Sequence, residues 1–312
     1  MLSAFVPGIR QRGPVCAVLL GLLGLALTDG RVGQDRAFRA SADLVRVYVT
    51  VRSSDGRLIR DLTQDDFVVF DDDRRQPITT FSSQPVPISL VAAWDLSPSM
   101  TGAGQGGRMG EGSLSKLQRL RAAAHALVSA LWKDDRTRFG TFSEEVAYSP
   151  VFTANKDTLH RIVREETWPG AFGSPVWTAL SEGVRLLASE PDRRVLLVLT
   201  DGEATEWSGP NALVGQLDAT NCMLYVVALE EAGLAGAARS VADRSGGGHA
   251  VIPRDADLSA EFASIVAEIH HQYLIGFVPE ALDGQMHRLT VRVNVAGATA
   301  RARGGYLAGS RR

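Results

Sequence analysis

The chain has 312 residues, which is room for about two domains and a large buried core. Apolar residues make up 45% and charged residues 22%, which is the composition of a globular protein and excludes a largely disordered chain, a collagen, a coiled coil or a protein with several membrane spans. The net charge is −2, so no overall positive field favours nucleic-acid binding, and two cysteines are too few for a disulfide framework.

Residues 1–30 have the features of an export signal. Arg10 and Arg12 precede an apolar run over residues 15–27, which polar residues at 28–30 then end. The run is too short to span a bilayer as a mature helix, but it has the length of a signal-peptide core. We therefore expect a signal peptide and export to the periplasm, the cell surface or the medium, with no stable membrane span after cleavage. Without cleavage, the segment would remain as an N-terminal membrane anchor.

The first block after it, residues 31–85, has the pattern of β-strands. Valine stands at every second position from Val45 to Val51, which predicts a half-buried strand. Further strand-like runs occur at 67–70 and 78–81. Between them stand three aspartates, at 71–73. Their spacing is unlike that of an EF-hand, so we interpret them as a solvated turn and not as a calcium site.

The second block, residues 86–272, alternates strand-like and helix-like patterns. Near-continuous apolar runs, as strands buried on both faces require, occur at 90–94, 195–199 and 223–229. Apolar residues recur at helical spacing over 114–131 and 258–269. This alternation predicts an α/β fold with a doubly wound, mostly parallel, Rossmann-like sheet. Cys222 adjoins the third apolar run, so we expect a buried structural thiol.

The third block, residues 273–312, has the same β-strand pattern as the first. Apolar and polar residues alternate over 289–295 and 298–303. Neither block is large enough to be stable alone, so we expect 273–312 to pack with 41–85 as one β-module into which the α/β domain is inserted. Four arginines would line the outer face of its last hairpin, as a solvated face or as a docking stripe for an anionic surface. They are Arg288, Arg292, Arg301 and Arg303.

Oxygen-bearing side chains follow the predicted strands, at the sheet edge where open α/β folds bind ligands. Asp95, Ser97 and Ser99 follow the first apolar run, Ser174 stands at a helix start, and Asp201 lies in a Thr-Asp-Gly motif after a later run. An oxygen-only donor set with few charges suits a hard cation such as Mg2+, which keeps several waters. The sequence therefore predicts a metal site at this edge.

With these residues in place, the second block resembles a von Willebrand factor type A domain and its metal-ion-dependent adhesion site. The resemblance implies that Ser97 and Ser99 bind the metal directly and that Asp95 and Asp201 act through water or lie nearby. Ser174 stands where the family usually has threonine. The resemblance also implies Mg2+ or Mn2+ as the cofactor and an Asp or Glu of a protein partner as the final ligand.

Flanking motifs extend the resemblance to about residues 41–308. They are LTQDDF at 62–67, QPI at 76–78, QYLIG at 272–276 and RGGY at 303–306. These motifs look like those of the exported bacterial VWFA-related proteins that are abundant in acidobacteria. That family is defined by sequence and mostly lacks known partners. The resemblance therefore says more about the fold of this chain than about its function.

Two other patterns invite different readings. Residues 102–107 satisfy G-x-G-x-x-G, but the following helix is expected to begin only near Ser113, so a flexible insert is favoured over a dinucleotide or phosphate site. His270 and His271 form the one histidine cluster along the sequence. They end a predicted helix and have no third ligand at obvious spacing, so a solvated helix end is favoured over zinc.

The functional expectation is an exported, divalent-cation-dependent protein-binding module. We expect no enzyme activity, no catalytic residue and no organic cofactor, because the sequence has neither a G-x-S-x-G nor an H-E-x-x-H motif. Two alternatives stay open: a scaffold with a vestigial metal site, and a hydrolase or nucleotide-binding enzyme with an unmarked site. The sequence leaves the partner and the oligomeric state undetermined.

Overall fold

A computed structural model describes residues 44–101, 111–165, 173–191, 193–200, 210–229, 236–253 and 255–309. The predicted signal peptide, the glycine motif at 102–107 and the predicted ligand Asp201 lie outside these residues. Within the described part of the chain, no helix has both the length and the apolar character that crossing a membrane requires.

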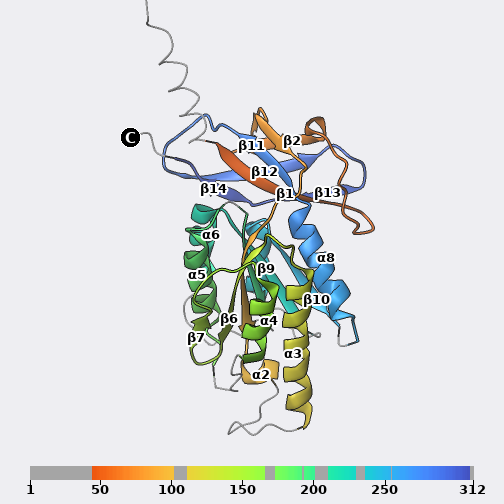
Figure 1. Ribbon diagram of the computed structural model, residues 1–312. Coiled ribbons are helices and arrows are strands. Elements are labelled where there is room, and N and C mark those ends of the chain that lie inside the picture. The colour runs from red at the N-terminus through yellow and green to blue at the C-terminus, as the bar shows by residue number, and fades with distance from the viewer. Residues whose placement is uncertain are drawn as a thin grey trace, which may run out of the picture. The chain divides into compact units, whose positions relative to one another are not determined.

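A six-stranded sheet forms the centre of the α/β region (Figure 1). In order across the sheet its strands are β10 (Gly248–Ile252), β9 (Cys222–Leu229), β8 (Arg194–Leu199), β5 (Ser89–Asp95), β6 (Arg136–Phe142) and β7 (Val146–Tyr148). All neighbours are parallel except β7, which runs antiparallel to β6. The central strand β5 pairs with β8 on one side and β6 on the other, so its C-terminal end lies well inside the edge of the sheet.

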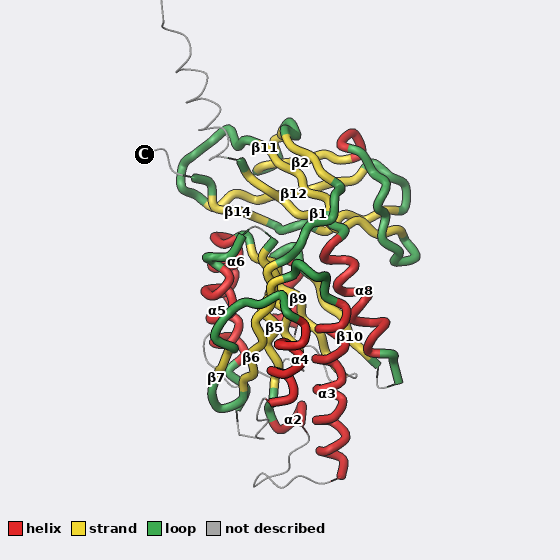
Figure 2. Tube along the Cα trace, in the orientation of Figure 1, coloured by secondary structure: helices red, strands yellow, loops and turns green. Residues whose placement is uncertain are grey.

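Helices cover both faces of this sheet, as Figures 1 and 2 show. Those packed on one face are α3 (Glu111–Ala130), α4 (Lys156–Glu165) and α8 (Leu258–His270), and those on the other are α5 (Val176–Leu187), α6 (Pro210–Thr220) and α7 (Gly236–Arg244). Side chains of β5 alternate between the two cores: Ala92 and Trp94 join the first, and Val91 and Ala93 the second. The doubly wound α/β fold predicted from the sequence is thereby confirmed.

Two four-stranded antiparallel sheets, which together we call the β-module, lie outside the α/β region. The first has the order β13 (Ala298–Arg301), β1 (Val45–Ser53), β11 (Tyr273–Phe277), β4 (Thr80–Ser82). The second has the order β14 (Gly305–Leu307), β12 (Met286–Val293), β2 (Phe67–Asp71), β3 (Arg74–Gln76). A short 3-10 helix, Gln64–Asp66, precedes β2. Apolar side chains of both sheets form one core, so the sheets pack face to face.

Strands from the two ends of the chain pair directly in the β-module. Strand β1 pairs with β11 and β13, and β2 pairs with β12. The chain leaves the module after β4 and returns to it at β11, and these two strands are hydrogen-bonded neighbours, with Ser82 opposite Leu274. The α/β region is therefore inserted between adjacent strands. The residue boundaries given above for separate domains stay a prediction.

Strand β1 is buried on both faces over its middle, whereas its alternating pattern predicted a half-buried strand. Val47 and Val49 face the core of the β-module, but Tyr48 and Thr50 are buried as well. The Arg193 guanidinium lies 4.9 Å from the centre of the Tyr48 ring, and the Gln272 amide donates a hydrogen bond to Thr50 Oγ1 at 3.1 Å. The second face of β1 is therefore covered by the α/β region.

Helix α8 is tied to the β-module by Glu268, whose carboxylate is buried. It accepts hydrogen bonds from the guanidinium groups of Arg52 on β1 and Arg301 on β13, and from Tyr225 Oη on β9 at 3.0 Å. Burying a charged carboxylate is costly unless it is paired and hydrogen-bonded, and both conditions hold here. One side chain thus joins strands of both parts of the protein.

Two histidines end α8 as expected, but His270 is completely buried and not solvated. Its Nε2 lies 2.9 Å from Asp135 Oδ1, and its ring stacks on Trp132 with 3.8 Å between the ring centres. The expectation of a solvated helix end is wrong for this residue, because a buried carboxylate pairs with the ring. His271 is half-buried.

The four arginines expected on one hairpin face do not share a face. Strands β12 and β13, which carry Arg288 and Arg301, belong to different sheets. Arg303 is 9% exposed, and burial lowers the pKa of its guanidinium to about 10.

The expected buried thiol is confirmed, because Cys222 is 2% exposed and burial raises its pKa to about 12.

Candidate metal site

The metal edge, by which we mean the C-terminal end of β5 and the residues around it, is built on Asp95. Asp95 is the last residue of β5 and is completely buried. Its Oδ1 accepts the Ser97 backbone N–H at 2.8 Å, and its Oδ2 accepts the hydroxyls of Ser174 at 3.0 Å and Thr200 at 2.6 Å. These donors fix the carboxylate and offset the cost of burying it.

The two hydroxyls that follow β5 lie next to each other. Ser97 Oγ and Ser99 Oγ are 3.1 Å apart, Ser97 being buried and Ser99 exposed. The short helix α2 (Pro98–Thr101) holds them, because both the backbone N–H and the hydroxyl of Thr101 donate to the Ser97 carbonyl, at 2.9 and 3.0 Å. Lys116 of α3 donates to the Ser99 carbonyl at 3.0 Å. Ser99 is therefore the exposed residue of this pair.

Ser174 is brought to the metal edge by the loop before α5. Gly173 precedes it with φ +120°, and a Cβ there would lie 3.2 Å from the Ser143 carbonyl oxygen. The positive φ favours glycine, and the close approach to the neighbouring loop leaves little room for a side chain. Gly173 thus lets the chain turn so that Ser174 is buried against Asp95.

The structure therefore brings together four of the five predicted ligands, namely Asp95, Ser97, Ser99 and Ser174. The fifth lies outside the described residues. Thr200 is a site residue that the sequence reasoning did not select, although it stands in the Thr-Asp-Gly motif directly after β8. Its position after the strand neighbouring β5 was the signal that could have identified it.

The donor set fits a hard divalent cation. Adjacent ligands of an octahedral Mg2+, at 2.0–2.1 Å from the ion, lie about 2.9 Å from each other. The hydroxyl oxygens of Ser97 and Ser99, the two predicted direct ligands, are 3.1 Å apart. The oxygens named here are carboxylate or hydroxyl atoms, which Mg2+ and Mn2+ prefer to nitrogen or sulfur.

The doubly wound sheet with helices on both faces defines an α/β domain of Rossmann-like architecture. The family model described as von Willebrand factor type A domain matches residues 90–265, more than half of the chain. The chain belongs to this family. No curated protein sequence matches it.

One solved structure of low identity shares the fold, and two others are similar over part of the chain. A von Willebrand factor type A protein from Catenulispora acidiphila is 12% identical, with a TM-score of 0.51 over 86% of this chain and 73% of that one. An aerotolerance-related membrane protein from Bacteroides fragilis is 16% identical, with a TM-score of 0.46 over 58% of this chain and 98% of that one.

A third similar structure is proximal thread matrix protein 1 of the mussel byssus, described with a zinc-occupied MIDAS motif. It is 13% identical, with a TM-score of 0.49 over 60% of this chain and 48% of that one. The present chain thus spans about half of the mussel protein.

Proposed function

We propose that this protein is an exported, divalent-cation-dependent protein-binding module. Mg2+ or Mn2+ would be held at the metal edge by Ser97 and Ser99, with Asp95, Ser174 and Asp201 in support, and an Asp or Glu of a partner would complete the coordination. The observation that carries the proposal is the buried Asp95 carboxylate, hydrogen-bonded to Ser174 and positioned beside two hydroxyls that are 3.1 Å apart.

The charge of this donor set supports an acidic partner. The predicted ligands include only two carboxylates, Asp95 and Asp201, and the remaining three are neutral hydroxyls. A divalent ion in such a site keeps much of its Lewis acidity, so an anionic ligand from outside binds it favourably. The exposed Ser99 beside the buried Ser97 opens the site to such a ligand on one side.

The neighbours of the two serines favour binding over hydrolysis. Among the described residues, the side chains of Ser97 and Ser99 hydrogen-bond to each other and not to a histidine. A serine nucleophile needs an adjacent base, which these contacts do not supply. The export part of the proposal rests on the signal-like pattern of residues 1–30.

Metal binding tests the site directly. Calorimetric titration with Mn2+ should show that Asp95→Asn weakens binding about 10- to 100-fold, the range that follows loss of a supporting contact at metal sites. Ser99→Ala removes a direct ligand and should weaken binding by at least as much. Ser99 is exposed, so its variant should fold normally, and Ser83→Ala serves as a control at another exposed serine. Equal Mn2+ affinity in the wild type and Ser99→Ala would contradict the assigned ligand set.

Partner binding tests the function. A crosslinking pull-down from the cell envelope, carried out with Mg2+ and with a chelator, should recover a protein only when the metal is present. Ser99→Ala should lose that protein and Ser83→Ala should keep it. Metal binding without any metal-dependent partner would favour the scaffold alternative, and turnover of a substrate would favour the enzyme.

A further inference from the structure

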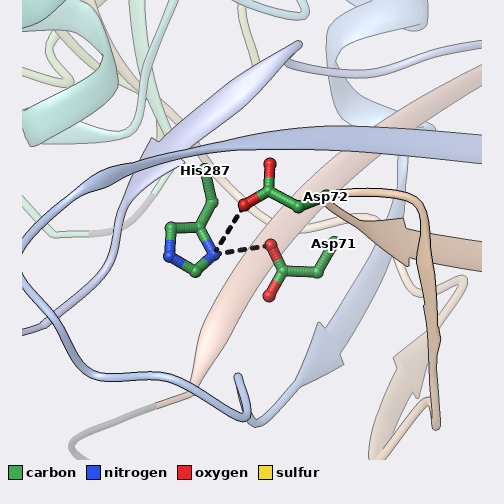
Figure 3. Close-up of side chains that lie close together, drawn as sticks. All are labelled: Asp71, Asp72 and His287. Carbon is green, nitrogen blue, oxygen red and sulfur yellow. Dashed lines mark hydrogen bonds and ion pairs between the residues drawn. The ribbon is translucent and has the colours of Figure 1, made fainter.

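A second group of metal-ligating side chains lies in the β-module, in different sheets from the metal edge. Asp71 ends β2, Asp72 begins the turn after it, and His287 stands in β12. The pairing of β12 with β2, which places Leu289 opposite Asp71, brings these residues together although they are far apart in the sequence. Figure 3 shows both carboxylates directed at the imidazole.

The three ligand atoms have the spacing of a small metal centre. His287 Nδ1 lies 2.8 Å from Asp71 Oδ1 and 3.6 Å from Asp72 Oδ2, and all three atoms lie within 4.8 Å of one another. Two ligands of a tetrahedral zinc ion, each at 2.0–2.1 Å, are about 3.3 Å apart. The two separations from His287 Nδ1 lie on either side of this value, so side-chain shifts of about half an ångström bring both carboxylate oxygens to ligand distance from this nitrogen.

The second oxygen of each carboxylate is also hydrogen-bonded, and the Tyr306 hydroxyl that binds Asp71 lies 3.3 Å from His287 Nδ1. Tyr306 Oη donates to Asp71 Oδ2 at 2.9 Å, and the Arg288 backbone N–H donates to Asp72 Oδ1 at 2.8 Å. Asp71 Oδ1 and Asp72 Oδ2 are thereby oriented toward His287. Hydrogen bonds that orient ligands in this way are typical of the second layer of protein metal sites.

The other nitrogen of the imidazole also faces a carboxylate. His287 Nε2 lies 3.3 and 3.4 Å from the two oxygens of Asp283, and the histidine side chain is only 8% exposed. Metal-bound histidines almost always donate their second N–H to a carboxylate, a carbonyl or a water, which fixes the ring and leaves the opposite nitrogen for the metal. Nδ1 faces the Asp71 and Asp72 oxygens and Nε2 faces Asp283, so Nδ1 is the nitrogen that would ligate an ion shared with Asp71 and Asp72.

The charges around the imidazole favour a divalent cation. Three carboxylates, from Asp71, Asp72 and Asp283, surround one histidine. The Arg288 guanidinium pairs with Asp73, and the Arg303 guanidinium lies 5.8 Å from the centre of the Tyr306 ring. The Asp72 side chain is 55% exposed, so an ion can enter from this side and keep a water as its fourth ligand.

We propose that Asp71, Asp72 and His287 form a second metal site, specific for Zn2+. Its nitrogen and carboxylate donors suit zinc, whereas the oxygen-only metal edge suits Mg2+ or Mn2+. The ion would join β2 to β12.

Titration of the full chain with Co2+, a spectroscopic substitute for Zn2+, tests this site. We expect a visible absorption band in the wild type and in Asp95→Asn, and its loss in Asp72→Asn and His287→Gln, with Zn2+ displacing the Co2+. His249→Gln is the matched control, since His249 also lies beside a carboxylate, Asp243 at 3.3 Å, but outside this group. A band that survives in Asp72→Asn, or no band in the wild type, would overturn the proposal.

Asp72→Asn keeps the test valid if His287→Gln does not fold. Asp72 has φ 45°, a conformation that asparagine adopts readily, and its side chain is exposed. A second readout is the 15N resonances of the His287 ring, which should shift with one equivalent of Zn2+. Because Asp95→Asn leaves this second site intact, the result is independent of the function proposed for the metal edge.

Discussion

The contact between α8 and the β-module leads to a quantitative prediction for Glu268→Gln. This change keeps the size of the side chain and an acceptor for Tyr225, but it removes the charge that two guanidinium groups share. A hydrogen bond to a charged group contributes about 1.5–3 kcal/mol to stability, and removal of one member of a buried ion pair costs about 3–5 kcal/mol.

The partial exposure of both arginines reduces this cost. The side chains of Arg52 and Arg301 are 36% and 29% exposed, so both recover some hydration once the carboxylate is gone. We therefore expect Glu268→Gln to lower the free energy of unfolding by about 2–3 kcal/mol. At roughly 2–4 °C per kcal/mol for a chain of this size class, Tm should fall by at least about 4 °C.

Urea denaturation followed by tryptophan fluorescence measures this change. All five tryptophans lie between residues 94 and 207, so the fluorescence reports on the α/β region, and circular dichroism reports on both parts. Glu165→Gln is the matched control, because Glu165 pairs with Arg161 on an exposed helix face, where such pairs contribute well under 1 kcal/mol. Equal stability losses in the two variants would refute the role given to Glu268.

Two further predictions concern stability. The pKa of His125 lies below its usual 6.5 because burial and then the neighbouring His160 disfavour the imidazolium, so protonation favours the unfolded chain. The stability of the wild type relative to that of His125→Gln should therefore fall as pH drops below about 6.5 in thermal melts, whereas identical profiles would contradict this. At Gly247 a Cβ would lie 1.9 Å from the Leu224 carbonyl oxygen, so Gly247→Ala should cost about 3 kcal/mol or more. Gly215→Ala, on an exposed and uncrowded face of α6, should instead gain about 0.5–1 kcal/mol, and a neutral Gly247→Ala would show that the backbone yields there.

The α/β fold was predictable because its signals are local. Apolar runs such as 195–199 coincide with strands whose both faces are buried, and helical spacing over 258–269 coincides with α8. The burial of β1 was only partly predictable, because it depends on contacts with residues that are distant in the sequence. Tyr48 and Thr50 look like solvent-facing positions in sequence, and only the tertiary packing of Arg193 and Gln272 buries them.

The two candidate metal sites show the same contrast. Asp95, Ser97 and Ser99 were predicted because they directly follow a recognisable strand, and such positions converge at one sheet edge. The aspartates at 71–73 were interpreted as a solvated turn because their spacing is unlike that of an EF-hand. This is wrong for Asp71, which is buried beside His287, a residue 216 positions away in the sequence. The pairing of β2 with β12 makes that contact, and strand pairing over such a distance cannot be read from periodicity.

The adjacency of β4 and β11 has a mechanical consequence. Both connections to the α/β region leave the β-module from these neighbouring strands, near the N-terminal end of β5, whereas the metal edge lies at its C-terminal end. A pulling force on a ligand held at Ser97 and Ser99 would act along β5, whose hydrogen bonds to β6 and β8 would share the load in shear. At the N-terminal end of β5, the same force would reach the β-module through β4 and β11 and would pull both strands in one direction. It would therefore not separate β4 from β11, the two strands that connect the α/β region to the β-module.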